Sequence, residues 1–249
     1  MTVQEFSNGF DTLVASYRRF KDFDKRELLD SIEFDEYEKS LYLTKAQEDI
    51  VLSLYNGRNS SLQSFEETEE LRRYLSELIQ DDEREPITNS SSTPLGIDGG
   101  KQFFSLPDDL WFITYESVLV SKNEDNCKGS FVLDVVPVTQ DEYHKIKRNP
   151  FRGANGRRAL RLDLSDNNIE IVSKYTIQKY YVRYLKKLKP IVLEDLPNGI
   201  TIGNTSLETP CEVHEGLHQI ILERAVQTAL QSKLGGMASN NTSKNINRE

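Results

Sequence analysis

Helix-type and strand-type segments occupy different parts of this 249-residue sequence, and this separation constrains the fold most. The first 80 residues carry apolar side chains at helical spacing, whereas the middle of the chain holds runs of β-branched and aromatic residues. One more amphipathic segment follows near the end. Segregated helices and strands are typical of α+β folds. We therefore expect an N-terminal helical bundle completed by a C-terminal helix, with an antiparallel β domain between them.

Polar and turn-forming stretches set the boundaries of the expected domains. The stretch DDEREPITNSSSTPLGIDGGK is rich in Ser, Thr, Pro and Gly, which predicts a linker loop at 81–101. We expect the helical bundle at 1–80 and, at 102–208, the antiparallel β domain with a short helix and a basic loop. A C-terminal helix at 209–234 should pack on the bundle. The polar tail at 235–249 would be ordered only by a partner.

Capping residues predict where individual helices begin and end. Thr44 and Gln47 form a capping-box pattern, which predicts a helix that starts at Thr44. Thr139 lies three residues before a glutamate and predicts a second, short helix. The last helix should close at Gly235 and Gly236.

Charge is distributed unevenly in a chain whose formal net charge is -9. Residues 22–85 hold 19 acidic and 8 basic residues, whereas residues 144–189 hold 13 basic and 3 acidic residues. Such a chain could bind a polyanion through its basic part, or it could dock against copies of itself, acidic face to basic face. Composition leaves both possibilities open.

The most basic segment is the glycine-containing stretch KIKRNPFRGANGRRALRLD at 145–163, where seven of nineteen residues are Lys or Arg. It contains a GxxG pattern at 153–156, but no Gly-Lys-Ser/Thr follows and the next element has strand character, which disfavours a phosphate loop. Arginines in a glycine-containing loop can instead donate bidentate hydrogen bonds to carboxylates. This favours an acidic protein partner.

A zinc site is the main catalytic alternative, because HEGLH at 214–218 matches the HExxH pattern. On a helix this spacing places two imidazoles on one face to bind zinc, with the glutamate activating a bound water. Such a site would make the chain a zinc metallopeptidase. However, His144 is the one histidine left for a third ligand, and Gly216 replaces the usual bulky apolar residue. The competing interpretation is a helix N-terminus with solvated histidines.

A nucleic-acid-binding module is a third, weaker hypothesis. Tyrosines and lysines alternate in KYTIQKYYVRYLKK, and such a surface could stack bases and neutralise phosphates. In a strand, however, the tyrosines at 175 and 181 would face away from those at 180 and 184. An ordinary half-buried strand therefore explains the segment better.

Several longer strings between about Leu43 and Leu230 form a recognisable pattern. They are YLTKAQEDIVLSLYNG, FEETEELRRYL, LPDDLWFITYE, PVTQDEYHKIKRNPFRGANGRRALRLDL, VSKYTIQKYYVRYLKKLKPIVLEDLP and TPCEVHEGLHQIILERAVQTAL. The most specific parts are NPFRG and RYLKKLKPIVLEDLP. With these strings the chain resembles a known family, the head-to-tail connector ring proteins of crAss-like short-tailed phages.

The resemblance implies a structural virion protein without catalysis, cofactor or metal. It implies a ring of twelve subunits in the portal-to-tail neck, which contacts the portal protein, other neck rings and tail proteins. Genomic DNA would pass through its channel without sequence-specific binding, and no membrane would be involved. Because the chain shows no signal-peptide pattern, we expect synthesis in the host cytoplasm before incorporation into the virion. The expected subunit or ring contacts are Phe151, Arg152, Arg157, Arg158, Arg161, Lys186 and Lys187.

Overall fold

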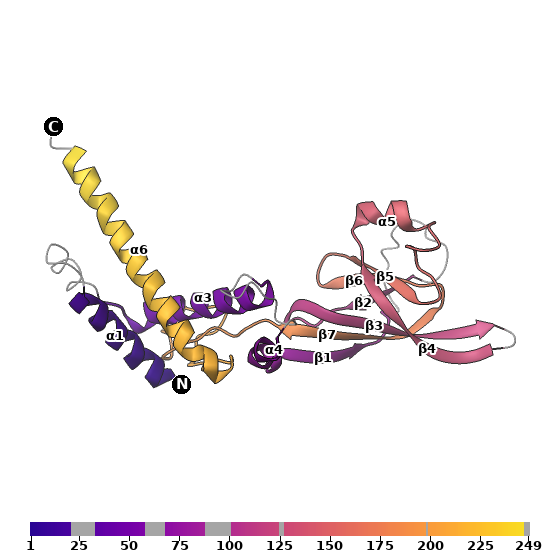
Figure 1. Ribbon diagram of the computed structural model, residues 1–249, viewed down its shortest axis with the longest axis horizontal. Coiled ribbons are helices and arrows are strands. Elements are labelled where there is room, and N and C mark those ends of the chain that lie inside the picture. Colours follow the sequence, from indigo (N-terminus) through magenta and orange to yellow (C-terminus); the bar gives the residue numbers. More distant parts are fainter. Residues whose placement is uncertain (21–32, 58–67, 88–100, 125–126, 198, 247–249) are drawn as a thin grey trace. The chain divides into compact units, whose positions relative to one another are not determined.

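The computed structural model divides the chain into two compact units (Figure 1). A helical unit comprises Met1–Leu78 with Leu188–Glu249, and a sheet unit comprises Ile79–Lys187. The structure describes residues 1–20, 33–57, 68–87, 101–124, 127–197 and 199–246. Because one unit is built mainly from helices and the other around a sheet, the α+β class is confirmed.

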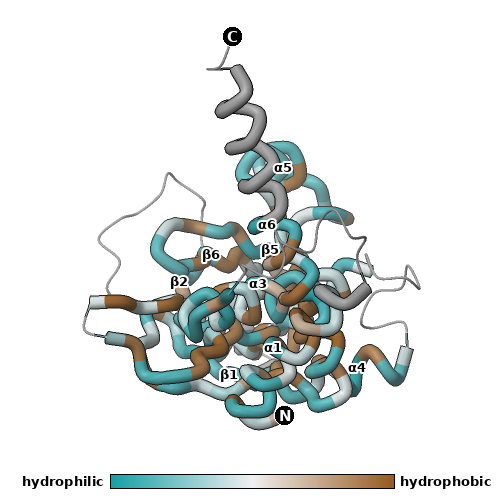
Figure 2. Tube along the Cα trace, turned by 90° about the vertical axis from the view of Figure 1, so that its left-hand side faces the viewer, coloured by the Kyte–Doolittle hydropathy of each residue, from teal (hydrophilic) through white to brown (hydrophobic). Residues whose placement is uncertain are grey.

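The helical unit surrounds a core of apolar side chains from helices at both ends of the chain. Its elements are α1 (Val3–Phe20), α3 (Glu36–Tyr55), α4 (Glu69–Ser76), the short 3₁₀ turn η2 (Glu215–Leu217) and α6 (His218–Ile246). Helix α6 contacts both α1 and α3. Hydrophobic and hydrophilic stretches alternate along the trace, as amphipathic elements require (Figure 2). The fully buried residues include Phe6, Phe10, Leu43, Val51, Ile221, Ala225 and Val226.

Helix α3 starts eight residues before the predicted capping box. Asp35 is the N-cap, and its side chain accepts a backbone N–H at 2.6 Å. Thr44 and Gln47 lie inside the helix and bind the segment after the last strand: Ile191 N–H donates to Thr44 Oγ1 at 3.0 Å, and Gln47 Nε2 donates to Lys189 O at 2.9 Å. The prediction of a helix start was wrong because these side chains make tertiary contacts. They hold the segment that follows Lys187 against the helices, so residues 188–208 of the expected β domain belong to the helical unit.

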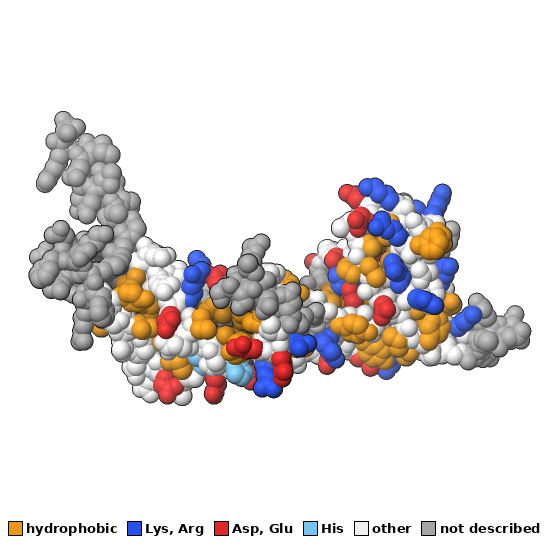
Figure 3. Space-filling model, in the orientation of Figure 1, with side chains coloured by type: hydrophobic (Ala, Val, Ile, Leu, Met, Phe, Trp, Pro, Cys, Tyr) orange, Lys and Arg blue, Asp and Glu red, His pale blue; other side chains and the backbone are white. Residues whose placement is uncertain are grey.

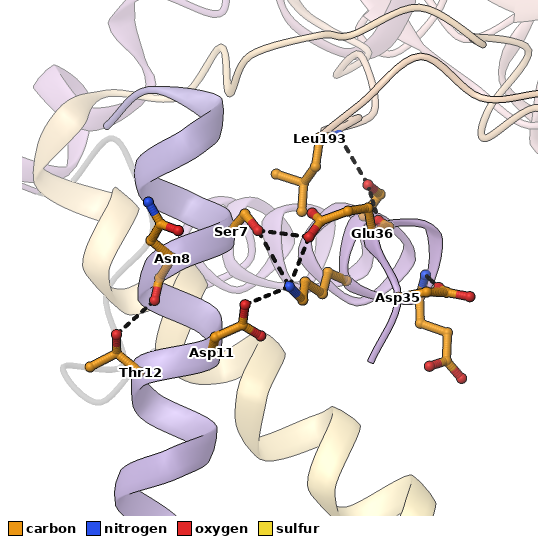
Figure 4. Close-up of polar contacts among 10 residues, drawn as sticks. Ser7, Asn8, Asp11, Thr12, Asp35, Glu36 and Leu193 are labelled. Carbon is orange, nitrogen blue, oxygen red and sulfur yellow. Dashed lines mark hydrogen bonds and ion pairs between the residues drawn. The ribbon is translucent and has the colours of Figure 1, made fainter. Parts of the chain in front are cut away.

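A buried lysine links α1 to α3 (Figure 4). The Lys39 side chain is 4% exposed, and its Nζ lies 2.7 Å from Asp11 Oδ2 and 2.8 Å from Glu36 Oε1. Ser7 accepts a further hydrogen bond from the same ammonium at 3.3 Å. Burial lowers the pKa of Lys39, but the two carboxylates outweigh this effect and raise the pKa above its ordinary value. The lysine therefore stays charged and fixes the two helices together.

Helix α6 does not stop at the two glycines where we expected its end. Its helical backbone continues through Gly235 and Gly236 to Ile246. A glycine inside a helix costs only about 1 kcal/mol, so it weakens a helix without ending it. Among the described residues, no helix is both long and apolar enough to cross a membrane.

The sheet unit is a seven-stranded mixed sheet in the order β1-β7-β3-β4-β5-β6-β2. The strands are β1 (Ile79–Arg84), β2 (Lys101–Ser105), β3 (Leu110–Glu124), β4 (Cys127–Pro137), β5 (Arg158–Asp163), β6 (Asn168–Val172) and β7 (Thr176–Lys186). All neighbouring pairs are antiparallel except β4 and β5, which are parallel. The purely antiparallel prediction was wrong at this pair. Helix α5 (Gln140–Ile146) and the basic loop carry the chain back, so β5 runs in the direction of β4.

The sheet curls around its own apolar core. Ile177 N–H on β7 donates to Gln102 Oε1 on β2 at 2.6 Å, and Ile87 N–H, just after β1, donates to Phe103 O at 2.8 Å. The two ends of the strand order therefore approach each other. The core between them includes Phe104, Val118, Leu133, Ile169, Ile171 and Tyr180.

Strand β1 occupies part of the expected linker at 81–101, although its sequence IQDDER is strongly polar. It pairs with β7 along its whole length, and ion pairs between side chains of the two strands add to this pairing. Asp81 Oδ1 lies 2.7 Å from Arg183 Nε, and Glu83 pairs with Lys179. Such cross-strand pairs support a solvent-facing edge strand that has few apolar residues of its own.

Candidate subunit-contact surface

The basic loop between α5 and β5 is held in shape by two asparagine side chains. Asn149 Oδ1 accepts the backbone N–H groups of Phe151 and Arg152 at 2.9 and 3.1 Å. Asn155 Oδ1 accepts those of Arg157 and Arg158 at 2.9 and 3.2 Å. These are local turns of the kind that asparagine forms with the backbone that follows it. The loop is therefore preorganised.

Gly153 packs the middle of this loop against α5. Its backbone N–H donates to Asn149 O at 2.7 Å. A Cβ at position 153 would lie 2.7 Å from Asn149 O and 2.9 Å from Ile146 O. Because both contacts are to backbone atoms, a larger residue would have to displace the loop. The glycine is required for this close approach rather than for phosphate binding.

The loop presents one large apolar side chain among basic residues. Phe151 is 84% exposed, and Arg152 and Arg157 are exposed beside it, whereas Arg158 is partly buried. None of these three arginines makes an ion pair with any residue that the structure describes. Lys and Arg side chains gather over this region of the sheet unit, with apolar atoms among them (Figure 3). An exposed aromatic ring surrounded by unpaired cations is typical of a protein contact.

Arg161 does not belong to this exposed set, although the sequence suggested it as a contact residue. Its side chain is 10% exposed, and its Nη1 donates to Glu116 Oε2 at 3.1 Å. Tyr180 Oη donates to the same carboxylate oxygen at 2.9 Å, and Asp163 Oδ1 lies 3.0 Å from Arg161 Nε. Arg161 is therefore a structural cation inside the sheet unit, and the contact surface that we propose below does not include it.

Burial dominates the protonation behaviour of this group. It raises the pKa of Glu116 above its ordinary value, although Arg161 and Tyr180 oppose the effect. Burial also raises the pKa of the Tyr180 hydroxyl, which the adjacent Glu116 carboxylate reinforces. The tyrosine therefore remains a hydrogen-bond donor at any physiological pH.

The remaining predicted contact residues, Lys186 and Lys187, lie at the end of β7. The strand order places β3 and β4 between β7 and β5, so the structure does not join these lysines to the basic loop within the sheet. Lys187 is exposed, and its backbone N–H donates to Asp109 O at 2.6 Å. Lys186 is partly buried and has an interaction of its own.

The HEGLH motif does not form a helical metal site. His214 precedes the 3₁₀ turn and accepts the Gly216 N–H at 3.1 Å, whereas His218 is the first residue of α6. The His218 side chain is buried, with 5% of the residue exposed, whereas the interpretation as a helix N-terminus predicts a solvated histidine. Its Nε2 lies 2.7 Å from Val213 O and its Nδ1 lies 2.6 Å from the Met1 amino nitrogen. Both ring nitrogens are thus occupied, and burial lowers the pKa of this histidine. The described residues contain no group of three or more His, Cys, Asp or Glu that could hold a metal ion.

The tyrosines of β7 behave as members of a half-buried strand. Tyr180 and Tyr184 are buried and contribute to the core of the sheet unit. Tyr181 points to the opposite face and is partly exposed. The alternation predicted from the sequence is confirmed for Tyr180, Tyr181 and Tyr184, but it is wrong for Tyr175, which precedes β7 and packs against the same core as Tyr180 and Tyr184. No continuous aromatic platform forms along this strand.

Sequence reasoning missed a hollow on the outer face of β1, β7 and β3. Its volume is about 420 Å³. Tyr115, which is 51% exposed, and Tyr181 contribute its aromatic lining. The other lining residues are Asp81, Asp82, Glu83, Val182 and Arg183. The three acidic residues fall within the expected linker at 81–101, and no local pattern indicates that they meet the tyrosines of two other strands.

Comparison with known proteins gives consistent matches along nearly the whole chain. The family described as phage tail ring protein 3/4 matches residues 1–242. The protein named Ring protein 3 of Bacteroides phage crAss001 is 43% identical over 234 residues, which cover 94% of this chain and 96% of that protein. Ring protein 4/5 of the same phage is 30% identical over 246 residues, which cover 95% of each chain.

Proposed function

Because this chain belongs to the phage tail ring protein 3/4 family of crAss-like phages, we propose that it is a structural ring protein of the virion. The observation that carries this proposal is the 43% identity to Ring protein 3 across 94% of the chain. A match of this length includes both compact units and the basic loop. No catalytic function is proposed.

We further propose that twelve copies form a closed ring in the neck between portal and tail. The ring would extend the DNA channel of the portal and provide a docking surface for tail components. The charge of the chain supports a passive channel, because a net charge of -9 disfavours tight binding of the DNA backbone. The helices α1, α3 and α6 would act in the ring as one bundle.

The Phe151 loop supports a protein contact rather than a DNA contact. Phosphate binding requires cations, and it gains nothing from a phenylalanine that is 84% exposed. Protein interfaces, in contrast, concentrate their binding energy in aromatic and arginine side chains. We therefore assign Phe151, Arg152, Arg157 and Arg158 to a contact between subunits or between rings. Lys186 and Lys187 would add charge at a separate place.

The neck position is tested by assembly with the cognate portal protein. The purified full-length chain is mixed with portal rings, and the particles are imaged by electron microscopy after negative staining. We expect additional density coaxial with the portal. A chain that assembles but never joins the portal or a neck component would contradict the neck position while leaving ring formation intact.

A further inference from the structure

We infer that the Phe151 loop of one copy docks into the Tyr115–Tyr181 hollow of a second copy, and that this head-to-tail contact repeats around the ring. The inference rests on the proposed function and extends it by naming both halves of one subunit contact. Both halves lie in the sheet unit, so the inference does not depend on how the two units of the chain are arranged.

The first half is a convex, rigid projection. Phe151 is 84% exposed at the tip of a loop whose backbone is fixed by Asn149 and by the tight packing of Gly153. Arg152 is exposed next to it. Since the loop is already ordered, docking would lose little conformational entropy. Such a loop provides an apolar anchor with a cation at its side.

The second half is a concave surface lined by aromatic side chains and by carboxylates that are ion-paired within their own chain. Tyr115 and Tyr181 offer aromatic surface to an incoming ring, and the volume of about 420 Å³ lies within the range of ligand-sized pockets. The lining includes three carboxylates, from Asp81, Asp82 and Glu83, but a single cation, from Arg183.

These carboxylates can accept a further cation although each has a partner in its own chain. Asp81 pairs with Arg183, Asp82 with Arg84 and Glu83 with Lys179. An ionised carboxylate offers about four acceptor positions, and these exposed pairs use only some of them. An incoming arginine can therefore join the existing pairs without displacing them.

The two halves are different surfaces of one unit, which gives the contact its head-to-tail character. The loop precedes β5, whereas the hollow lies on β1, β7 and β3, on the other side of β4 in the strand order. Because Phe151 is 84% exposed, the loop does not fill the hollow of its own chain. A contact between two unlike surfaces repeats from copy to copy and closes into a ring when the rotation allows.

Photo-crosslinking tests the contact while it retains the aromatic side chain. The full-length Phe151→benzoylphenylalanine variant is assembled, its rings are confirmed by particle mass, and the sample is irradiated and digested for peptide mapping. We expect intermolecular crosslinks to the segments of β3 and β7 that contain Tyr115 and Tyr181. The matched control is Val132→benzoylphenylalanine, because Val132 is 56% exposed on β4 of the same unit and should not label the hollow.

The outcomes separate this contact from the proposed function. Rings whose Phe151 position labels another surface, another Phe151 loop or bound DNA would overturn the contact and leave the ring intact. Failure of the unmodified chain to form rings would overturn both. As an independent measurement, Phe151→Ala and Tyr115→Ser should each raise the concentration for half-assembly about 30-fold, as expected for a hot-spot residue, whereas Val132→Ala should not change it. Unchanged assembly of both variants would also refute the contact.

Discussion

Replacing Arg161 by methionine should strongly destabilise the sheet unit. Arg161 and Glu116 have side chains that are only 10% and 6% exposed, so removing the cation leaves a buried carboxylate with Tyr180 as its remaining hydrogen-bond donor. Breaking a buried pair in this way costs about 3–5 kcal/mol. Replacing both partners, as in Glu116→Leu with Arg161→Met, should restore much of that loss, because no uncompensated charge remains.

The pH dependence of the free energy of unfolding of the Arg161→Met variant provides a second, independent test. Burial raises the pKa of Glu116, so the folded state binds this proton more tightly than the unfolded state does. Stability from this group is therefore gained as pH falls through the folded pKa and is lost as pH rises. Without Arg161 the pKa of Glu116 rises further, so the deficit of the variant should shrink between pH 7 and pH 5, by at most about 1.4 kcal/mol per pH unit.

Urea unfolding followed by tryptophan fluorescence measures this effect directly. Trp111 is the single tryptophan of the chain and lies on β3, so its emission reports on the sheet unit. The matched control is Arg157→Ala, an exposed arginine just before β5, which should change stability by less than about 0.5 kcal/mol. If Arg161→Met were as mild as this control, the description of Arg161 as a structural cation would be wrong.

Three further predictions concern other parts of the molecule. Gly153→Ala should weaken ring assembly without unfolding the sheet, because its Cβ would displace the loop; normal assembly by particle mass would contradict this role. Lys39→Met should destabilise the helical unit by about 1–3 kcal/mol, because it removes charge-assisted hydrogen bonds between α1 and α3. Far-UV circular dichroism during urea unfolding measures the change. A smaller loss would show that the Lys39 contacts contribute little to the stability of the helical unit. Cys211 should react slowly with iodoacetamide at pH 8 in a Cys127→Ser background, because burial raises the pKa of its thiol to about 11; labelling as fast as in urea would refute the burial.

The sequence predicted those features that depend on local patterns. The α+β class followed from the separation of helical and strand periodicity, and Thr139 is the N-cap of α5 as its spacing indicated. Strands β3 and β4 pair antiparallel, in agreement with the expected antiparallel β domain. In the basic loop, the exposure of Phe151 agrees with its position between glycine, proline and arginine residues.

Features that depend on distant partners could not be predicted in this way. The partner of Arg161 is Glu116, which lies 45 residues earlier on β3, a strand that β4 separates from β5 in the sheet. Thr44 and Gln47 form a valid capping pattern, yet their side chains bind backbone groups more than 140 residues away. The hollow requires β1, a polar strand that pairs along its whole length with β7 and carries side chains of opposite charge to Lys179 and Arg183.

The central claim, that this chain forms closed rings, is tested most directly by the particle mass of the purified full-length protein. The chain has a mass of 28.6 kDa, and mass photometry across a concentration series resolves a monomer from a ring of many copies. We predict one dominant species of twelve times the chain mass, with no continuous ladder of larger filaments. A particle that keeps the monomer mass at every concentration, both alone and with the portal, would contradict the account.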